Sequence, residues 1–342
     1  MSDNQSSKKT TIYDLAVLAG TSPGTVSAVL NGNWQKRRIS KSLAEKVQKL
    51  ADAHGYAANM QARALRRERS GIIGMIIPMY DNRYFSSIAQ TFESAARLRG
   101  LLPIVISTQR DPDLEASAAK AMLAYQVEHL ICAGATDPDR IHDLCAAAGV
   151  PTFNLDLPGT KAPSVISDNF GGALELTRRV LNRIDQKNGD IANVIFVGGR
   201  QTDHNTIERI RGFTSAYEER GITPRPDQIL ACGYAAHKAS QALSEALASY
   251  SNGLSGMFVN STISLEGVMT YLDQVGDLKD QTFPIGCFDW DPFAAMLRPE
   301  IEMVKQDVAS MMAQVFELVD NKASGQVLLF EIPPIFRQQN PD

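Results

Sequence analysis

The chain has 342 residues and a formal net charge of −4, a length that exceeds one ordinary domain and suits a small head followed by a two-lobed body. No stretch approaches the roughly 18 consecutive apolar residues of a membrane-spanning helix, and the polar start has no apolar signal region, so we expect no membrane association and a cytoplasmic location. The four cysteines have no C-x-x-C spacing and the five histidines do not cluster, which argues against a disulfide framework, a metal site or another cofactor.

Charge is divided unevenly along the chain. Residues 1–70 hold 12 Lys and Arg against 5 Asp and Glu, whereas residues 71–342 hold 22 against 33. A basic head on an acidic body is typical of a protein whose N-terminal segment contacts nucleic acid. Residues 1–10 form a polar tail that we expect to be disordered.

Two short helices joined by a Gly-containing turn are expected within residues 11–32. Ser22 is placed to cap the second helix, and Pro23 fits its first position, where a missing N–H costs nothing. Such a pair is a helix-turn-helix, whose second helix enters the major groove of DNA. The apolar positions of that helix leave four residues predicted to face away from the core: Gly24, Thr25, Ser27 and Ala28. A third helix is expected from Ser40 to Gly55, and it completes a domain over residues 11–58.

The segments TIYDLAVLAGTSPGTVSAVLNG and ISKSLAEKVQKLADAHGYAANMQARAL resemble the N-terminal module of the LacI/GalR family of bacterial transcriptional regulators. The insertion NGNWQKRRIS is longer than the usual turn between the second and third helices and is similar to the fructose repressor (catabolite repressor/activator) branch. The resemblance implies DNA contacts from these residues: Tyr13, Ser22, Pro23, Gly24, Thr25, Ser27, Ala28, Asn31, Arg38, Ser40, Tyr56, Asn59, Arg63 and Leu65.

Residues 59–69 match the hinge helix of that family. The resemblance implies that this segment folds on operator DNA, pairs with its dimer mate in the minor groove and inserts Leu65 between base steps. The alternative is a solvated linker helix with charged ends. One departure is Ala58, which stands where the family usually has proline before Asn59.

The recognition helix is unusual for the family. Its first, second and sixth residues usually carry long side chains, and here they are Pro23, Gly24 and Ala28. We therefore expect base reading from the hydroxyls of the helix and from the loop before the third helix, with Arg38 the best candidate. The alternative is that Lys36, Arg37 and Arg38 form a run that binds phosphates.

From Ser70 onward, apolar runs alternate with amphipathic helical patterns. Strands are expected at 71–78, 102–108, 127–135, 150–157, 193–199, 228–234, 256–261 and 282–289. Helices are expected at 85–99, 113–124, 171–185, 206–220, 236–250 and 264–275. This alternation predicts an α/β body of doubly wound parallel sheets. The resemblance implies a two-lobed, periplasmic-binding-protein-like body for effector binding and dimerisation over residues 70–342, with lobe 1 at about 71–168 and 305–333 and lobe 2 at about 169–304 and 334–342.

Ligands of open α/β sheets collect beyond the carboxyl ends of the strands. Carboxylates there can accept hydrogen bonds from sugar hydroxyls, a guanidinium can bind vicinal oxygens or a phosphate, and an aromatic ring can cover an apolar sugar face. Each residue alone could be a turn former or a surface ion-pair partner. Together with the family positions they predict an effector site for a sugar or sugar phosphate, made of Tyr84, Phe85, Asp156, Asp168, Arg209, Ser261, Asp289 and Gln306.

Departures from the family concern the identity of that ligand. Ser261 stands where many relatives have Asn, and Trp290 follows Asp289 where a second acidic residue is common. Asp168 could instead cap the crossing between the lobes.

The resulting hypothesis is a DNA-binding regulator, most simply a repressor of carbon-metabolism genes, that binds a palindromic operator as a homodimer. Alternatives are a dual activator and repressor, a sugar-binding protein or enzyme on the same body, and a nonspecific architectural DNA binder. An enzyme is not expected, because GIIGM is not G-x-G-x-x-G, VGGR is not a P-loop and G-x-S-x-G is missing. No leucine heptads follow the last core segment, so we expect a dimer without a tetramer-forming bundle.

Overall fold

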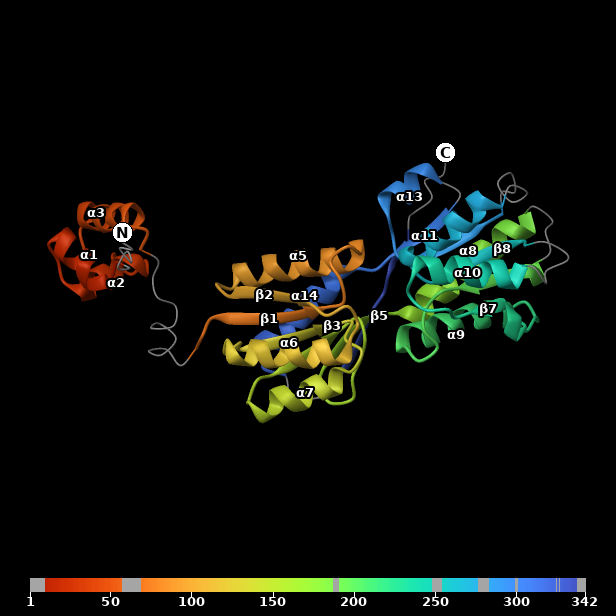
Figure 1. Ribbon diagram of the computed structural model, residues 1–342, viewed down its shortest axis with the longest axis horizontal. Coiled ribbons are helices and arrows are strands. Elements are labelled where there is room, and N and C mark those ends of the chain that lie inside the picture. Colours follow the sequence, from red (N-terminus) through yellow and green to blue (C-terminus); the bar gives the residue numbers. More distant parts are fainter. Residues whose placement is uncertain are drawn as a thin grey trace, which may run out of the picture. The chain divides into compact units, whose positions relative to one another are not determined.

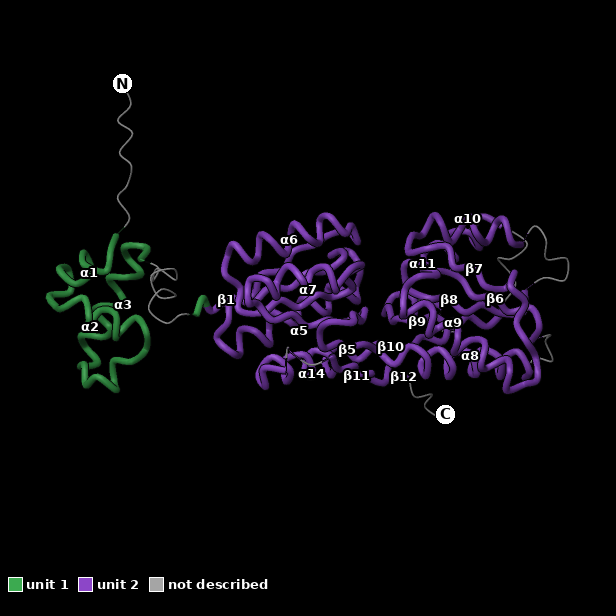
Figure 2. Tube along the Cα trace, turned by 90° about the horizontal axis from the view of Figure 1, so that it is seen from below, with its two compact units in different colours: residues 1–70 green, residues 71–342 purple. Residues whose placement is uncertain are grey.

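The computed structural model describes residues 10–56, 69–186, 191–247, 254–275, 283–298, 301–323, 325 and 327–336. The chain forms two compact units, residues 1–70 and residues 71–342 (Figure 2). The expected hinge helix and its residues Asn59, Arg63 and Leu65 lie outside the described residues.

The described residues of the first unit form three helices: α1 (Ile12–Ala19), α2 (Pro23–Leu30) and α3 (Lys41–Ala53). Gly20 ends α1 in the left-handed region, with φ of 69°, where glycine has no steric penalty. The hydroxyl of Ser22 accepts the N–H of Thr25 at the start of α2, and that of Ser40 accepts the N–H of Leu43 at the start of α3. The predicted helix-turn-helix, with Ser22 as the cap of its second helix, is therefore confirmed.

The core of this unit is built from one apolar stripe of each helix, including the fully buried Leu15, Val26 and Val47. One orientation was predicted wrongly, because Ala28 is buried, with 7% of its surface exposed. The eight-residue α2 packs against both α1 and α3. Two neighbours cover more of the helix than a single apolar stripe, and a methyl side chain fits on the additional covered side.

The second unit contains a first sheet whose strands are all parallel, in the order β11-β5-β4-β3-β1-β2. Its strands are β1 (Ile72–Ile77), β2 (Leu102–Ser107), β3 (His129–Ala133), β4 (Thr152–Leu155), β5 (Ser164–Ser167) and β11 (Leu329–Ile332). One face packs against α5 (Arg83–Leu98) and α14 (Val308–Asp320), and the other against α6 (Pro112–Ala124) and α7 (Pro138–Ala147) (Figure 1). We call this sheet and its helices lobe 1.

Lobe 2 has a second sheet in the order β12-β10-β9-β8-β6-β7. Its strands are β6 (Val194–Val197), β7 (Ile229–Leu230), β8 (Gly256–Val259), β9 (Ile285–Phe288), β10 (Ile301–Lys305) and the antiparallel β12 (Ile335–Phe336). Helices α8 (Asn169–Gln186) and α9 (His204–Glu218) cover one face, and α10 (Ala236–Leu247) and α11 (Thr262–Gln274) cover the other. The smaller elements are α13 (Pro292–Leu297) and the 3-10 turns η1 (Ile191–Asn193) and η2 (Pro226–Gln228).

Both sheets are doubly wound, as predicted from the alternation of strands and helices. The chain passes between the sheets after β5, after β10 and after β11. Strands of both lobes therefore direct their carboxyl ends toward a shared boundary within this unit, which is where polar side chains gather. None of the described helices is long and apolar enough to cross a membrane.

Candidate functional site

A small cavity of about 30 Å³ lies between the lobes, and we call it the inner cavity. Asp156 follows β4 of lobe 1, whereas Asp289 and Gln306 follow β9 and β10 of lobe 2. The lining residues are Asn82, Tyr84, Phe85, Arg110, Asp156, Asn205, Arg209, Tyr234, Ser261, Ile263, Asp289 and Gln306. The structure thus brings the predicted site residues together, with Asp168 as the exception.

The two carboxylates of the inner cavity occupy similar strand-end positions in the two lobes. Asp156 has φ of 73° and Asp289 has φ of 90°, a left-handed conformation that costs free energy in a residue other than glycine. Asp156 Oδ1 accepts hydrogen bonds from Tyr84 Oη at 3.0 Å and from Asn205 Nδ2 at 3.2 Å. Asp289 Oδ1 accepts one from Gln306 Nε2 at 2.5 Å. The strained backbone thereby directs both carboxylates at donors between the lobes.

Arg209 is held from three directions. It projects from α9 with 3% of its surface exposed, and its Nε donates to Asn169 Oδ1 at 2.8 Å. Its Nη1 donates to the carbonyl of Asn260 at 2.6 Å, and its guanidinium carbon lies 3.7 Å from the ring centre of Phe288. A charged fork held this firmly is preorganised to bind oxygens of a ligand.

Burial dominates the ionisation of the site. It raises the pKa of Asp289 from 3.8 to about 6, against the opposing charge of Arg209 and the Gln306 hydrogen bond. Burial also raises the pKa of Asp156, while Arg110 and Arg209 lower it, and it raises the pKa of Tyr84 well above its usual value. Desolvated carboxylates of this kind are strong acceptors for hydroxyl groups.

Arg110 was not predicted and is the main addition from the structure. It follows β2, with φ of 58°, and its guanidinium carbon lies 4.7 Å from the ring centre of Tyr234 and 5.4 Å from that of Phe85. Its Nε is buried and has no hydrogen-bond partner among the described residues. The strand-end rule that found Asp156 also applies to Arg110 and Tyr234, at the ends of the expected strands 102–108 and 228–234.

Asp168 and Ser261 are engaged in helix starts. Asp168 Oδ1 accepts the N–H of Gly171 at 2.7 Å in the first turn of α8, and Asp168 does not line the inner cavity. Ser261 lines it, but its hydroxyl caps α11 by accepting the N–H of Ser264 at 3.3 Å.

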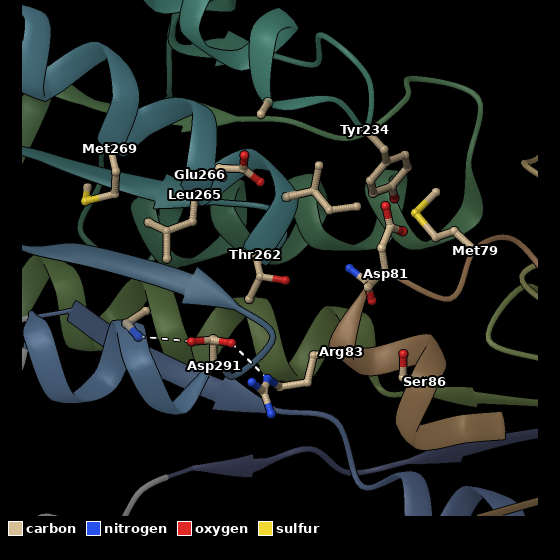
Figure 3. Close-up of a pocket in the computed structure, with 14 residues that line it drawn as sticks. Met79, Asp81, Arg83, Ser86, Tyr234, Thr262, Leu265, Glu266, Met269 and Asp291 are labelled. Atoms are coloured by element: carbon tan, nitrogen blue, oxygen red, sulfur yellow. Dashed lines mark hydrogen bonds and ion pairs between the residues drawn. The ribbon is translucent and has the colours of Figure 1, made fainter. Parts of the chain in front are cut away.

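A larger cavity of about 730 Å³ adjoins the inner one, and we call it the outer cavity (Figure 3). Asn82, Tyr234 and Ile263 line both. Its apolar side chains include Met79, Leu265 and Met269, and carboxylates and one cation stand among the other lining residues: Asp81, Arg83, Glu266 and Asp291. The three shared residues place the outer cavity directly beside the inner one.

The candidate DNA-reading surface lies on the first unit. Tyr13, Ser22, Gly24, Arg38 and Ser40 are exposed. The residues that are partly exposed are Pro23, Thr25, Ser27, Asn31 and Tyr56. Asn31 Nδ2 donates to the carbonyl of Ser27 at 2.7 Å and to its hydroxyl at 3.2 Å.

The loop between α2 and α3 is anchored by its apolar ends. Trp34 and Ile39 pack against the core, and the N–H of Ile39 donates to the carbonyl of Trp34 at 2.9 Å. Lys36, Arg37 and Arg38 are exposed, and Arg38 adopts a left-handed conformation with φ of 55°. The loop is thus a compact turn that presents three cations to solvent.

Each of the two units matches a known protein family. Residues 11–59 match the family model described as bacterial regulatory proteins, lacI family, and residues 73–326 match the periplasmic binding protein domain. The chain is 59% identical over 194 residues to the ribitol operon repressor of Klebsiella aerogenes. This alignment covers 57% of this chain and 72% of that protein. It is 31% identical over 215 residues to the fructose operon regulatory protein of Vibrio cholerae serotype O1 (strain ATCC 39315 / El Tor Inaba N16961). This alignment covers 62% of this chain and 64% of that protein.

Among solved structures, the lac repressor dimer bound to operator and the anti-inducer ONPF is similar in fold. The TM-score is 0.78 at 22% identity, over 96% of this chain and 97% of that one. At this identity the likeness concerns the fold alone.

Proposed function

This chain belongs to the lacI family of bacterial regulatory proteins, and from that premise we propose that it represses an operon for the use of a pentitol such as ribitol, or of a closely related sugar. It is a DNA-binding transcriptional regulator of carbon metabolism and not an enzyme. The observation that carries the proposed effector class is the inner cavity, with Asp156, Asp289 and Arg209 converging from two lobes. The 59% identity to a ribitol operon repressor supports a polyol as the first candidate.

The chemistry of the inner cavity suits a chain of hydroxyl groups. Each hydroxyl can donate to a carboxylate and accept from a guanidinium or an amide, and the side chains of Asp156, Arg209 and Asn205 provide these groups. The aromatic residues Tyr84 and Phe85 add an apolar wall. The polar groups of the inner cavity now bond to one another, as Tyr84 and Asn205 do to Asp156, so a bound pentitol must take the place of some of these partners. We assign to the effector the change in the relation of the two lobes that accompanies this exchange of partners.

Operator binding follows from the first unit. A single helix-turn-helix reads few base pairs, whereas two related by symmetry read half-sites roughly 10 bp apart, centre to centre. We therefore assign a homodimer on a palindromic operator. A regulator of operons acts where the chromosome is, which supports the cytoplasm as its location.

The first test joins operator and effector. The DNA is a palindromic site that the protein itself selects from random sequences, and random DNA of equal length is the control. Fluorescence anisotropy should show tight binding to the selected site and weaker, more salt-dependent binding to random DNA. Ribitol should weaken operator binding about 5- to 150-fold, the usual range of such coupling. Equal affinity for both DNAs would contradict operator specificity, and a screen without any responding pentitol or sugar would contradict the effector class.

Arg209→Ala should abolish the response to ribitol while leaving operator affinity unchanged. It leaves the buried acceptors on Asn169 and Asn260 without their donor, so the free energy of unfolding should also fall by about 1–3 kcal/mol. Arg211→Ala is the matched control, because Arg211 lies two residues further along α9, is exposed and forms an ion pair with Glu208 of the same helix. If Arg209→Ala responds at the normal ribitol concentration, the site is assigned wrongly.

A further inference from the structure

An ion pair spans the outer cavity and joins the two lobes. Arg83 is the first residue of α5 in lobe 1, and Asp291 is the N-cap of α13 in lobe 2. Arg83 Nε lies 2.9 Å from Asp291 Oδ2 (Figure 3). The Arg83 side chain is 49% exposed and that of Asp291 is 26% exposed. Any separation of the lobes at this point must break the pair.

Asp291 is fixed to its own lobe by its other oxygen. Oδ1 accepts the backbone N–H of Phe293 at 2.8 Å and that of Ala294 at 3.0 Å. Burial would raise the pKa of Asp291, but the Ala294 N–H and the Arg83 side chain hold it below its usual value. The carboxylate is therefore charged at neutral pH and directs one oxygen across the gap.

Each partner is connected along the chain to a wall of the inner cavity. Arg83 is followed by Tyr84, whose hydroxyl donates to Asp156. Asn82, which precedes Arg83, is buried and caps α5 by accepting the N–H groups of Tyr84 and Phe85. On the other side, Asp291 lies two residues after Asp289. Neither Arg83 nor Asp291 lines the inner cavity itself.

We propose that Arg83 and Asp291 act as a positioning pair that draws the effector-binding walls of the two lobes together and so tunes effector affinity without contacting the effector in the inner cavity. The inference rests on the proposed function in that it takes the inner cavity as the effector site. A ligand that needs the closed arrangement binds more weakly in proportion as the closed fraction falls. A partly exposed ion pair contributes modestly to the free energy of the closed arrangement, so its loss should weaken ribitol binding by about two- to fivefold.

The first measurement needs no effector. Spin labels on Lys120→Cys in α6 and His237→Cys in α10, both exposed positions, report the distance between the lobes by double electron–electron resonance. Cys232 is partly exposed and is replaced by Ser, whereas Cys132, Cys145 and Cys287 are buried. Labelled chain is diluted into an excess of unlabelled chain so that each dimer carries one pair of labels. Arg83→Gln and Asp291→Asn should each add a population at longer distance.

The second measurement is ribitol affinity by calorimetry. Asp291→Asn keeps an oxygen that can cap α13 but loses the charge, and Arg83→Lys keeps the charge and should restore most of the affinity lost in Arg83→Gln. The double variant should be no weaker than either single variant, because the pair is broken once. Arg97→Gln is the control, since it breaks a pair with Glu93 inside α5 and should change neither readout.

Distance distributions that superimpose on those of the wild type overturn the proposal, as do unchanged ribitol affinities in Arg83→Gln and Asp291→Asn. Additive losses in the double variant also overturn it, because they assign separate roles to the two residues. A wild-type chain that binds no pentitol or sugar contradicts the proposed function instead, and the distance measurement then still decides whether the pair holds the lobes together.

Discussion

Asp289 combines two costs, a left-handed backbone and a buried carboxylate. Burial favours its neutral form and raises its pKa to about 6. In an unfolded chain this carboxyl would bind a proton only at pH values near or below its ordinary pKa of 3.8. Between these values the folded protein holds more protons than the unfolded one, so the free energy of unfolding falls as pH rises. Such a cost is typical of a group that is kept for binding and not for stability.

We predict that Asp289→Asn stabilises the body above pH 6 relative to the wild type, and that this advantage disappears toward pH 4. The asparagine can still accept the hydrogen bond of Gln306, so the comparison isolates the charge. A shift from 3.8 to about 6 corresponds to roughly 2–3 kcal/mol in the free energy of unfolding. Urea denaturation of both proteins across this pH range measures the difference.

Asp291→Asn provides a control of opposite sign. The pKa of Asp291 is lowered in the folded protein, so its charge contributes stability above the unfolded pKa, and that stability is lost as pH falls. A difference for Asp289→Asn that does not change between pH 4 and pH 6 would show that its carboxyl titrates normally.

At the residue scale, chemistry at strand ends was predictable and side-chain orientation was not. Asp156 and Asp289 were found because each follows an apolar run. Arg110 obeys the same rule, but a cation after a strand is common on protein surfaces, and only its place between the rings of Phe85 and Tyr234 distinguishes it. Ala28 was misplaced because an alanine fits either a buried or an exposed helix face, and the neighbouring helices decide which.

At the scale of elements, the site depends on how closely α8 and α9 approach. A Cβ atom at Gly212 of α9 would lie 2.5 Å from the carbonyl oxygen of Phe170 and 2.7 Å from the backbone nitrogen of Leu174, both in α8. Only glycine allows this contact without displacement. The same two helices carry Asn169 and Arg209, which are joined by a 2.8 Å hydrogen bond. The glycine contact thus sets the position of the guanidinium.

We predict that Gly212→Ala forces the helices apart, lowers the free energy of unfolding by about 1–3 kcal/mol and weakens ribitol binding. Operator affinity without effector should change little, because the first unit is a separate compact unit. Glu218→Ala, an exposed change on the same helix, is the control. Calorimetry and thermal unfolding measure both effects, and a ribitol affinity equal to that of the wild type would separate helix spacing from the site.

The loop between α2 and α3 is the second element with a functional consequence. Its length was visible in the sequence, but its anchoring was not, because Trp34 could equally have been an exposed DNA contact. With Trp34 and Ile39 packed on the core, the position of Arg38 is fixed relative to the recognition helix. That fixed position is what base reading requires.

We predict that Arg38 reads a base. Asparagine tolerates the left-handed backbone at this position, so Arg38→Asn removes the long side chain with little strain. Affinities are measured for every single-base variant of one half-site. Arg38→Asn should lose its base preference at one position of that half-site, with about 1–3 kcal/mol of discrimination lost there. Lys36→Asn is the control and should weaken binding uniformly. A uniform loss for Arg38→Asn, with a salt slope smaller by about 1, would assign Arg38 to a phosphate.

At the scale of the whole molecule, the main strands of both sheets were predictable, but the strands near the crossings were not. The expected strands coincide with apolar runs of the sequence. The strands β5, β10, β11 and β12 were not recognised. Of these, β11 and β12 are short and only partly buried, and β11 pairs with a strand far away in sequence. Their pairing is set by the passage of the chain between lobes, which leaves no local pattern.

These crossings make effector binding a property of both lobes, and this leads to a prediction about the complete regulator. If ribitol favours an arrangement of the body that binds operator poorly, thermodynamic linkage requires the operator to disfavour ribitol by the same factor. We expect the dissociation constant of ribitol, measured by calorimetry on the operator-bound dimer, to exceed that of the free dimer by the factor found for operator binding in anisotropy.

Random DNA is the control for this comparison and should leave ribitol affinity close to that of the free dimer at equal salt. An operator that leaves ribitol affinity unchanged, while ribitol still releases the operator, would break the linkage cycle. The release would then have to come from a site other than the inner cavity. Arg209→Ala separates these cases, because it should remove the reciprocal effect only if the inner cavity is the site through which ribitol acts.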